Sequence, residues 1–245
     1  MLELKALPAG CAQRRRGNAC DDCGARAVSV CASMAEAELG RLDALADHLD
    51  LKAGDVMIRE GDPALHAFNV TSGAIRVFKL LPDGRRQITG FLFAGDFLGL
   101  ATGESYVFSA EAITPATACR FRKSDYRALI HETPALEAAL LDRANDELAA
   151  AQNQMLLLGR KTALERLASF LLDLPARDRS GQIPADHVHL PMTRSEIADY
   201  LGLTIETVSR VLTRLKSTAV IRFSTMTDLT IVQPDRLRRL AEGEA

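Results

Sequence analysis

The chain lacks the long apolar runs that a membrane-spanning helix requires. No uncharged apolar stretch among its 245 residues approaches the roughly 18 residues of such a span. The first residues, MLELKALPAG, contain no apolar core followed by a small-residue cleavage site, so we expect no secretory signal and a cytoplasmic protein. With 47% hydrophobic and 25% charged residues, the composition is that of a globular protein with a buried core.

The chain also lacks a strong excess of positive charge and any recognisable catalytic motif. Its formal net charge is −2, but residues 160–245 hold 13 basic and 11 acidic side chains, against 17 and 21 in the remainder. The mildly positive C-terminal third is consistent with a polyanionic partner for that part of the chain. We find no Ser/His/Asp set, phosphate-binding glycine loop or paired carboxylates on a recognisable scaffold. We therefore predict that the protein is not an enzyme.

Cysteine is scarce but clustered. Three of the five cysteines, Cys20, Cys23 and Cys31, lie within twelve residues, with Cys11 just upstream and Cys119 far downstream. Cytoplasmic thiols are kept reduced, so such a cluster indicates metal binding or catalysis rather than disulfides. His187 and His189 form an H-x-H pair, which we interpret as ordinary loop or surface histidines.

Glycine punctuates residues 50–125 at short intervals, with apolar runs such as DVMI, AIRVFKLL and QITGFLF between the glycines. Many short strands separated by Gly, Pro and Asp turns predict an antiparallel β-sandwich or barrel. Within it, LLPDGRRQI predicts a hairpin with Pro82-Asp83-Gly84 at its turn.

Residues 134–173 contain almost no helix breakers and are rich in Ala, Leu, Glu and Gln, which predicts one long helix. Apolar residues recur along it at spacings of three and four, as in a coiled-coil seam: Leu141, Ala144, Leu148, Ala151, Met155 and Leu158. We predict that two such helices pack across a dimer axis, because one small domain cannot cover so long a helix. Packing of the stripe on the β domain is the alternative. Pro175 and the polar ARDRSGQ then predict a break or loop.

The segment MTRSEIADYLGLTIETVSRVLTRLKSTAVIR, residues 192–222, carries the sharpest local signal. Thr193 and Glu196 form a capping box that opens a short helix. Gly202 can supply the turn because it adopts positive φ easily, and Thr204 can cap a second helix. Two short helices with this turn predict a helix-turn-helix, with an ordinary helical hairpin as the alternative. The following AVIRFSTMTDLTIV predicts a two-stranded wing.

The second of these helices would be the recognition helix of a DNA-binding protein. Its outward side chains can all form hydrogen bonds, and we predict that they contact double-stranded DNA: Thr204, Glu206, Thr207, Ser209, Arg210 and Arg214. Arg210 can make a bidentate contact to guanine, and Glu206 can accept from cytosine N4. A dimer would read two half-sites about 34 Å apart.

These parts together resemble the cyclic-AMP receptor protein superfamily of bacterial transcription regulators, over residues 36–240. ETVSR at 206–210 is similar to the E-x-x-S-R motif of its FNR (fumarate and nitrate reduction) branch, and MLLLGRKTALERLASFL at 155–171 also resembles that branch. The resemblance implies an α+β fold with four parts. These are a cysteine-rich cluster-binding segment at 1–35, a β-roll of jelly-roll type at 36–133, a dimerisation helix at 134–173 and a winged helix-turn-helix at 174–245. It also implies that Glu206, Ser209 and Arg210 read palindromes of the TTGAT…ATCAA kind. A further implication is contact with RNA polymerase. The hairpin around Pro82-Asp83-Gly84-Arg85 is a candidate for that contact, and a plain solvent-exposed turn is the alternative.

The same resemblance bears on the ligand. Cyclic-nucleotide binders of the superfamily carry an Arg-Ser-Ala step, but here Phe108 precedes Ser109 and Ala110. Phenylalanine cannot neutralise a phosphate, so we expect no cyclic nucleotide.

The FNR branch instead holds a 4Fe–4S cluster on four cysteines, which implies Cys20, Cys23, Cys31 and Cys119 as ligands here. The seven-residue gap before Cys31 resembles the rhizobial FnrN-like subgroup, and we expect Cys11 not to be a ligand. The implied function is an oxygen-sensing regulator of anaerobic or microaerobic genes. A structural zinc on the same thiols, or a cluster-free regulator sensing redox state or nitric oxide, remains open.

Overall fold

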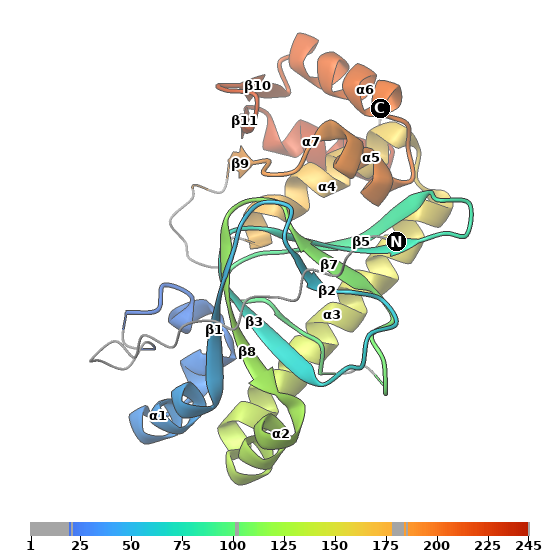
Figure 1. The fold of residues 1–245 in the computed structure, drawn as a ribbon. Coiled ribbons are helices and arrows are strands. Elements are labelled where there is room, and N and C mark those ends of the chain that lie inside the picture. Colours follow the sequence, from blue (N-terminus) through green and yellow to red (C-terminus); the bar gives the residue numbers. More distant parts are fainter. Residues whose placement is uncertain (1–19, 21, 101–102, 178–183, 185, 245) are drawn as a thin grey trace.

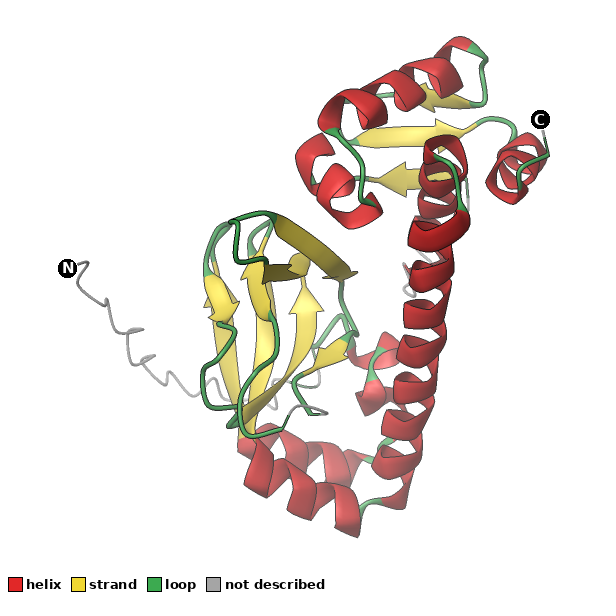
Figure 2. Cartoon of the chain, turned by 90° about the vertical axis from the view of Figure 1, so that its right-hand side faces the viewer, coloured by secondary structure: helices red, strands yellow, loops and turns green. Residues whose placement is uncertain are grey.

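The computed structural model describes residue 20 and the ranges 22–100, 103–177, 184 and 186–244. Three parts follow one another along the chain: a β domain, a long helix, and a smaller domain of helices and short strands (Figure 1). In Figure 2 the long helix runs beside the β domain and carries the smaller domain at its C-terminal end. In the described ranges, no helix is both long enough and apolar enough to cross a membrane.

Two four-stranded antiparallel sheets form the β domain, as the glycine punctuation predicts. The first sheet has the order β1 (Ala46–Leu51), β8 (Ala116–Arg122), β3 (His66–Ser72), β6 (Phe97–Leu98). The second has the order β2 (Val56–Ile58), β7 (Ser109–Ala112), β4 (Ile75–Leu80), β5 (Arg86–Leu92). Phe68 and Val70 of the first sheet share one buried core with Ile75 and Ala110 of the second. The predicted hairpin is confirmed, because β4 and β5 pair across residues 81–85.

A second apolar core lies where the N-terminal segment meets two helices that the sequence analysis did not predict. These helices are α1 (Glu36–Leu45) and α2 (Lys123–Glu132), preceded by the 3-10 turns η1 (Arg26–Val28) and η2 (Val30–Ser33). Leu39 and Leu42 of α1 and Tyr126 of α2 are buried in this core together with Cys31 and Cys119. Two of the predicted cluster ligands therefore belong to one packed unit.

The predicted single helix over 134–173 is wrong in one respect. It is divided into α3 (Pro134–Arg160) and α4 (Ala163–Arg177). The break is a second capping box: the Thr162 backbone N–H donates to Glu165 at 3.1 Å, and the Glu165 N–H donates to the Thr162 hydroxyl at 3.4 Å. The Arg166 guanidinium also donates to the carbonyls of Lys161 and Leu158 at the end of α3. Pro175 does not end α4, which continues through it to Arg177.

The smaller domain contains the predicted winged helix-turn-helix. Its elements after α4 are β9 (His187–His189), α5 (Arg194–Leu201), α6 (Ile205–Ser217), β10 (Ile221–Phe223), β11 (Asp228–Ile231) and α7 (Pro234–Glu242). The wing pairs as predicted, and β9 adds a third strand in the order β10-β11-β9. Helix α4 packs against α6 and α7, so it belongs to this domain by its contacts.

Candidate functional site

The turn between α5 and α6 has the geometry of a helix-turn-helix. The Thr193 hydroxyl accepts from the Glu196 N–H, and the Glu196 carboxylate accepts from the Thr193 N–H, so the predicted capping box is present. Gly202 ends α5 with φ of 61°, which favours glycine. The Thr204 hydroxyl then accepts from the Thr207 N–H at 3.2 Å and begins α6. These contacts fix the residue at which α6 begins.

Helix α6 separates an apolar face from a polar one. Val208, Leu212 and Leu215 are buried in the core of the domain. The predicted DNA-contacting side chains lie on the other face, where they are exposed or half-buried: Thr204, Glu206, Thr207, Ser209, Arg210 and Arg214. The pKa of Glu206 is lowered by its own backbone N–H, by the Thr204 side chain and by the charge of Arg210. The polar face therefore carries an ionised carboxylate close to the charge of the Arg210 guanidinium.

The wing is stabilised at its turn by a single carboxylate. Asp228 accepts from the Thr225 hydroxyl at 2.6 Å and lies 2.7 Å from Nδ1 of His189. His187 Nε2 is 3.6 Å from the same carboxylate. These contacts hold the pKa of Asp228 well below its usual range. The H-x-H pair is therefore a structural part of the wing.

The predicted dimer seam lies along α3, and its Leu and Met residues are largely uncovered in the single chain. Leu141, Leu148 and Met155 are 63%, 58% and 69% exposed. Ala144 and Ala151 are exposed as well, whereas Leu158 is half-buried against the core of the smaller domain. A stripe of large apolar side chains exposed over several turns is typical of a helix that pairs with another.

The four predicted cluster ligands come together at one end of the β domain. Cys20 and Cys23 precede η1, Cys31 lies in η2, and Cys119 lies on β8. Cys31 and Cys119 are buried, and Cys20 and Cys23 are partly exposed. Cys11 lies outside the described residues.

The pKa shifts of these thiols have burial as their main cause, with smaller contributions from one another's charges. Burial raises the pKa of Cys119 to about 12, and the charges of Cys23, Cys20 and Cys31 add to the rise. Burial also raises the pKa of Cys20 to about 12, with a contribution from Asp43. The pKa of Cys31 is raised by burial and by Cys23, against an opposing hydrogen bond with Ser29. Cys20, Cys31 and Cys119 are therefore protonated at neutral pH unless a metal displaces the proton.

Two side chains that the sequence analysis missed connect Cys20 with Cys119. The Cys20 thiol donates to Asp43 Oδ1 at 3.7 Å, and His48 Nε2 lies 3.4 Å from the same oxygen. Strands β1 and β8 place His48 opposite Cys119, with Nδ1 at 3.7 Å from Sγ. A carboxylate next to an imidazole is a common arrangement around metal ligands, but nothing in the local pattern at positions 43 and 48 indicates it.

The donor set fits an iron–sulfur cluster. Four thiols are the ligands that such a cluster takes. The buried hydroxyl of Tyr126 has no hydrogen-bond partner among the described residues, and the charge of Cys31 helps to raise its pKa, so an unused donor lies near the thiols. Four thiolates are also the ligands of a structural zinc site. Among the described residues, no three Cys, His, Asp or Glu side chains are arranged to hold a single ion.

The thiol-bearing loop is tied to the long helix α3. Arg143 donates a hydrogen bond to the Val28 carbonyl, and the Ser33 hydroxyl donates to the Ala135 carbonyl at 3.3 Å. Gly95 allows the loop to approach the β domain, since a Cβ there would lie 2.6 Å from the Val28 oxygen. The cysteine segment thus contacts the helix that carries the predicted seam.

The position that takes arginine in cyclic-nucleotide binders is occupied by an apolar ring. Phe108 is half-buried against the β-domain core, and its ring lies 6.3 Å from that of Tyr106. Ser109 and Ala110 follow at the start of β7.

Two sequence families match the two domains. The family described as cyclic nucleotide-binding domain matches residues 48–133, and the family described as Crp-like helix-turn-helix domain matches residues 165–240. The second match begins inside α4, in agreement with the contacts of that helix.

Several regulators are similar over most of their length. "Nitrogen fixation regulation protein FixK" of Bradyrhizobium diazoefficiens is 41% identical over 92% of this chain and 94% of its own. "Transcriptional activator protein FnrL" of Cereibacter sphaeroides is 37% identical over 82% of this chain and 83% of its own. The solved structure of FixK2 from Bradyrhizobium japonicum is 37% identical, with a TM-score of 0.74, over 80% of this chain and 96% of that one.

Proposed function

Because the chain belongs to the CRP/FNR family of transcription regulators, and to its FNR-type branch, we propose that it is an oxygen-responsive homodimer that controls anaerobic or microaerobic genes. The observation that carries the oxygen response is the gathering of Cys20, Cys23 and Cys31 with Cys119 around one buried core. Relatives are named as regulators of nitrogen fixation and as transcriptional activators, which supports the class of target genes.

DNA binding is assigned to the polar face of α6. Glu206, Ser209 and Arg210 read bases of a TTGAT…ATCAA palindrome, and Thr204, Thr207 and Arg214 contact the backbone or neighbouring bases. Two copies pack through the exposed stripe of α3, so that two recognition helices meet two half-sites. The dimer is therefore the unit that recognises a palindrome.

The four cysteines hold a 4Fe–4S cluster. When bound, this cluster supplies an oxygen-labile link between the N-terminal loop and β8. The chain's own residues carry the consequence to the dimer surface: Arg143 holds the loop carbonyl of Val28, and Ser33 holds Ala135 at the start of α3. Ala144 and Ala151 at seam positions make the interface small, so a change of a few kcal/mol decides between dimer and monomer.

The proposal is tested by counting iron and acid-labile sulfide on protein purified without oxygen. We expect about four of each per chain, a visible band that bleaches in air, and loss of palindrome binding after bleaching. Cys23→Ser, at a partly exposed position, should lose the iron, while Cys11→Ser is the matched control that keeps it. If the protein contains zinc or no metal, and air does not affect its DNA binding, the proposed oxygen-sensing role is wrong.

One alternative remains within the same fold. A cluster-free regulator could respond to redox state or nitric oxide through the same thiols, and the metal count separates the two. Neither version uses a cyclic nucleotide, since Phe108 offers no charge to a phosphate. Added cyclic AMP should leave palindrome binding unchanged.

We further propose that the tip of the β4–β5 hairpin contacts RNA polymerase. Leu80 and Leu81 are exposed there beside an exposed Asp83–Arg85 ion pair. Substitutions in this tip should abolish activation of transcription and leave DNA binding intact. Unchanged activation of transcription would show that the hairpin tip is a solvent-exposed turn without a polymerase contact.

A further inference from the structure

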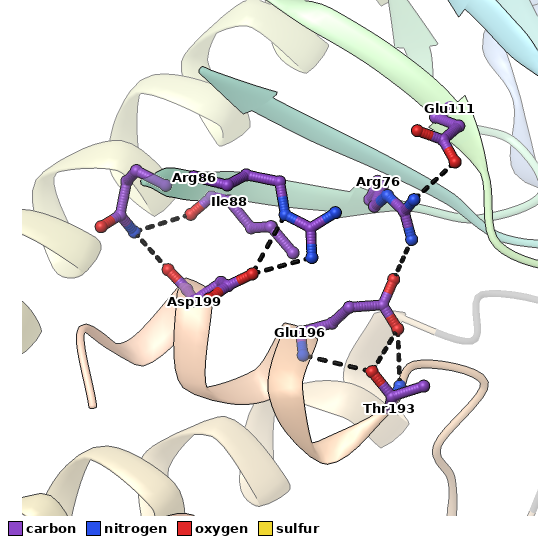
Figure 3. Close-up of polar contacts among 8 residues, drawn as sticks. Arg76, Arg86, Ile88, Glu111, Thr193, Glu196 and Asp199 are labelled. Atoms are coloured by element: carbon purple, nitrogen blue, oxygen red, sulfur yellow. Dashed lines mark hydrogen bonds and ion pairs between the residues drawn. The ribbon is translucent and has the colours of Figure 1, made fainter. Parts of the chain in front are cut away.

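The β4–β5 hairpin binds α5, the first helix of the helix-turn-helix, through charged side chains (Figure 3). Arg86 donates from Nε and Nη2 to Asp199 Oδ2 at 3.0 and 2.8 Å. Gln87 Nε2 donates to the Asp199 carbonyl at 2.7 Å. Arg76 forms ion pairs with Glu196 of α5 and with Glu111 of β7. We call this set the hairpin–helix contact.

The ion pairs of this contact are largely removed from water. The Arg76 side chain is 17% exposed and that of Glu196 only 4%. Burial alone would raise the pKa of Glu196, but hydrogen bonds from Thr193 and the Arg76 guanidinium lower it overall, so the carboxylate is ionised. One carboxylate thus serves both as the capping-box residue of α5 and as the partner of a β4 arginine. A displacement of the hairpin would disturb both interactions.

Apolar packing and one further hydrogen bond complete the attachment. The rings of Phe91 on β5, Phe170 on α4 and Tyr200 on α5 lie 5.2–6.2 Å apart. Gln154 of α3 donates to the Tyr200 carbonyl at 2.9 Å. Helix α5 is therefore held from the hairpin and from the long helix, while the polar face of α6 stays uncovered.

We propose that Arg76 and Arg86 are positioning residues for DNA binding. They hold α5, and with it α6, at a fixed orientation relative to the long helix, so that the two recognition helices of a dimer meet both half-sites at once. The inference rests on the proposed dimeric binding of a palindrome, but not on the cluster. The uncovered polar face of α6 agrees with this inference, because the hairpin–helix contact involves α5 and leaves that face of α6 open to DNA.

The contact also reaches the sensor sheet. Glu111 lies on β7, two residues after Ser109 and three after Phe108, where the family's ligand segment lies. Arg76 therefore joins a strand of the sensor domain to the capping residue of the helix-turn-helix. A shift of β7 would therefore displace the Arg76 side chain and alter its ion pair with Glu196 of α5.

A charge exchange tests the inference in the full-length chain. Arg86→Glu and Asp199→Arg are made singly and together, and binding is measured to a palindrome and to a single half-site. We expect each single change to lower the ratio of palindrome affinity to half-site affinity about 10-fold. The reason is that two misoriented α6 helices cannot bind both half-sites at once, so the added affinity of bivalent binding is lost. The double exchange should restore most of that ratio. Arg85→Glu is the matched control, since Arg85 pairs with Asp83 at the hairpin tip.

A second measurement does not depend on DNA. Backbone hydrogen exchange in α5 should be faster in each single variant, normal in the double variant and normal in Arg85→Glu. If exchange and the affinity ratio stay unchanged in the single variants, Arg86 does not position the domain. If the single variants bind the palindrome more tightly, the contact is inhibitory and the inference is wrong. If the unmodified chain does not bind the palindrome, the proposed function is wrong. The hydrogen-exchange result then still shows whether the hairpin–helix contact holds α5.

Discussion

His48 and Cys119 face each other across the antiparallel strands β1 and β8, with Nδ1 of the imidazole 3.7 Å from Sγ. The other ring nitrogen of His48 reaches Asp43, whose same oxygen accepts from the Cys20 thiol. One imidazole and one carboxylate therefore bridge a thiol of the N-terminal loop to a thiol of the sheet. Residues around metal ligands commonly orient them in this way.

Replacing Asp43 by Ala should loosen this bridge. We expect iron to be lost to a chelator about 10–100-fold more readily under anoxia, because the Cys20 thiolate is no longer positioned. Asp47→Ala is the matched control, since Asp47 pairs with Arg120 on the surface. Equal iron retention in Asp43→Ala and the unmodified chain would assign Asp43 no positioning role.

The exposed stripe on α3 can be tested by one charged substitution. Leu148→Glu places a carboxylate in the middle of the predicted seam, where each copy of Leu148 contributes about 1.5–3 kcal/mol of burial. Since both copies change, we expect the dimer dissociation constant to rise by about 100-fold or more, measured by analytical ultracentrifugation. Leu65→Glu alters a leucine of similar exposure in the β domain and should leave the dimer intact. A dimer that survives Leu148→Glu would place the interface elsewhere.

The elements that follow local rules were predictable from the sequence. The β4–β5 hairpin comes from Pro82-Asp83-Gly84, and the helix-turn-helix comes from two N-caps and Gly202, all within a few residues of the structure they fix. The second capping box, Thr162 with Glu165, obeys the same rule but is set in a run of good helix formers. The helix propensity of the surrounding residues therefore predicts one continuous helix, whereas the capping box divides it into α3 and α4.

The contacts that join the parts could not be predicted in this way. Arg86 and Asp199 are 113 residues apart, and Arg143 and Val28 are 115 apart. No spacing rule connects such positions, because only the packed domains bring them together. In the sequence, Asp43 and His48 have no feature that distinguishes them from other polar residues. Only the folded positions of α1 and β1 bring them next to the thiols.

Glu196 should make stability depend on acid pH. Its pKa in the folded chain lies below the unfolded value of about 4.3, so its contribution is complete above that pH and is lost as the pH falls through the folded pKa. Glu196→Gln should be less stable than the unmodified chain at pH 7, and the difference should shrink as the pH falls below about 4. Urea unfolding at several pH values measures this.

The control for that experiment is Glu60→Gln. Glu60 pairs with Lys79 at a largely exposed site. Exposed pairs contribute about 0–1 kcal/mol, so this variant should follow the unmodified chain at every pH. A Glu196→Gln curve that runs parallel to that of the unmodified chain through the acid range would show that the carboxylate carries no net interaction.

Arg210 should decide which base is read at its position in the operator. It is exposed on the polar face of α6, beside the ionised Glu206, and can contact guanine through two hydrogen bonds. Arg210→Ala should cost about 1–3 kcal/mol for the palindrome and relax the preference at one base pair of each half-site. Lys216→Ala removes an equal charge from the last turn of the same helix, and it should weaken all sequences alike. Binding measured at fixed salt to a set of single-base variants distinguishes the two, and an Arg210→Ala protein that keeps the full base preference would assign recognition to another residue.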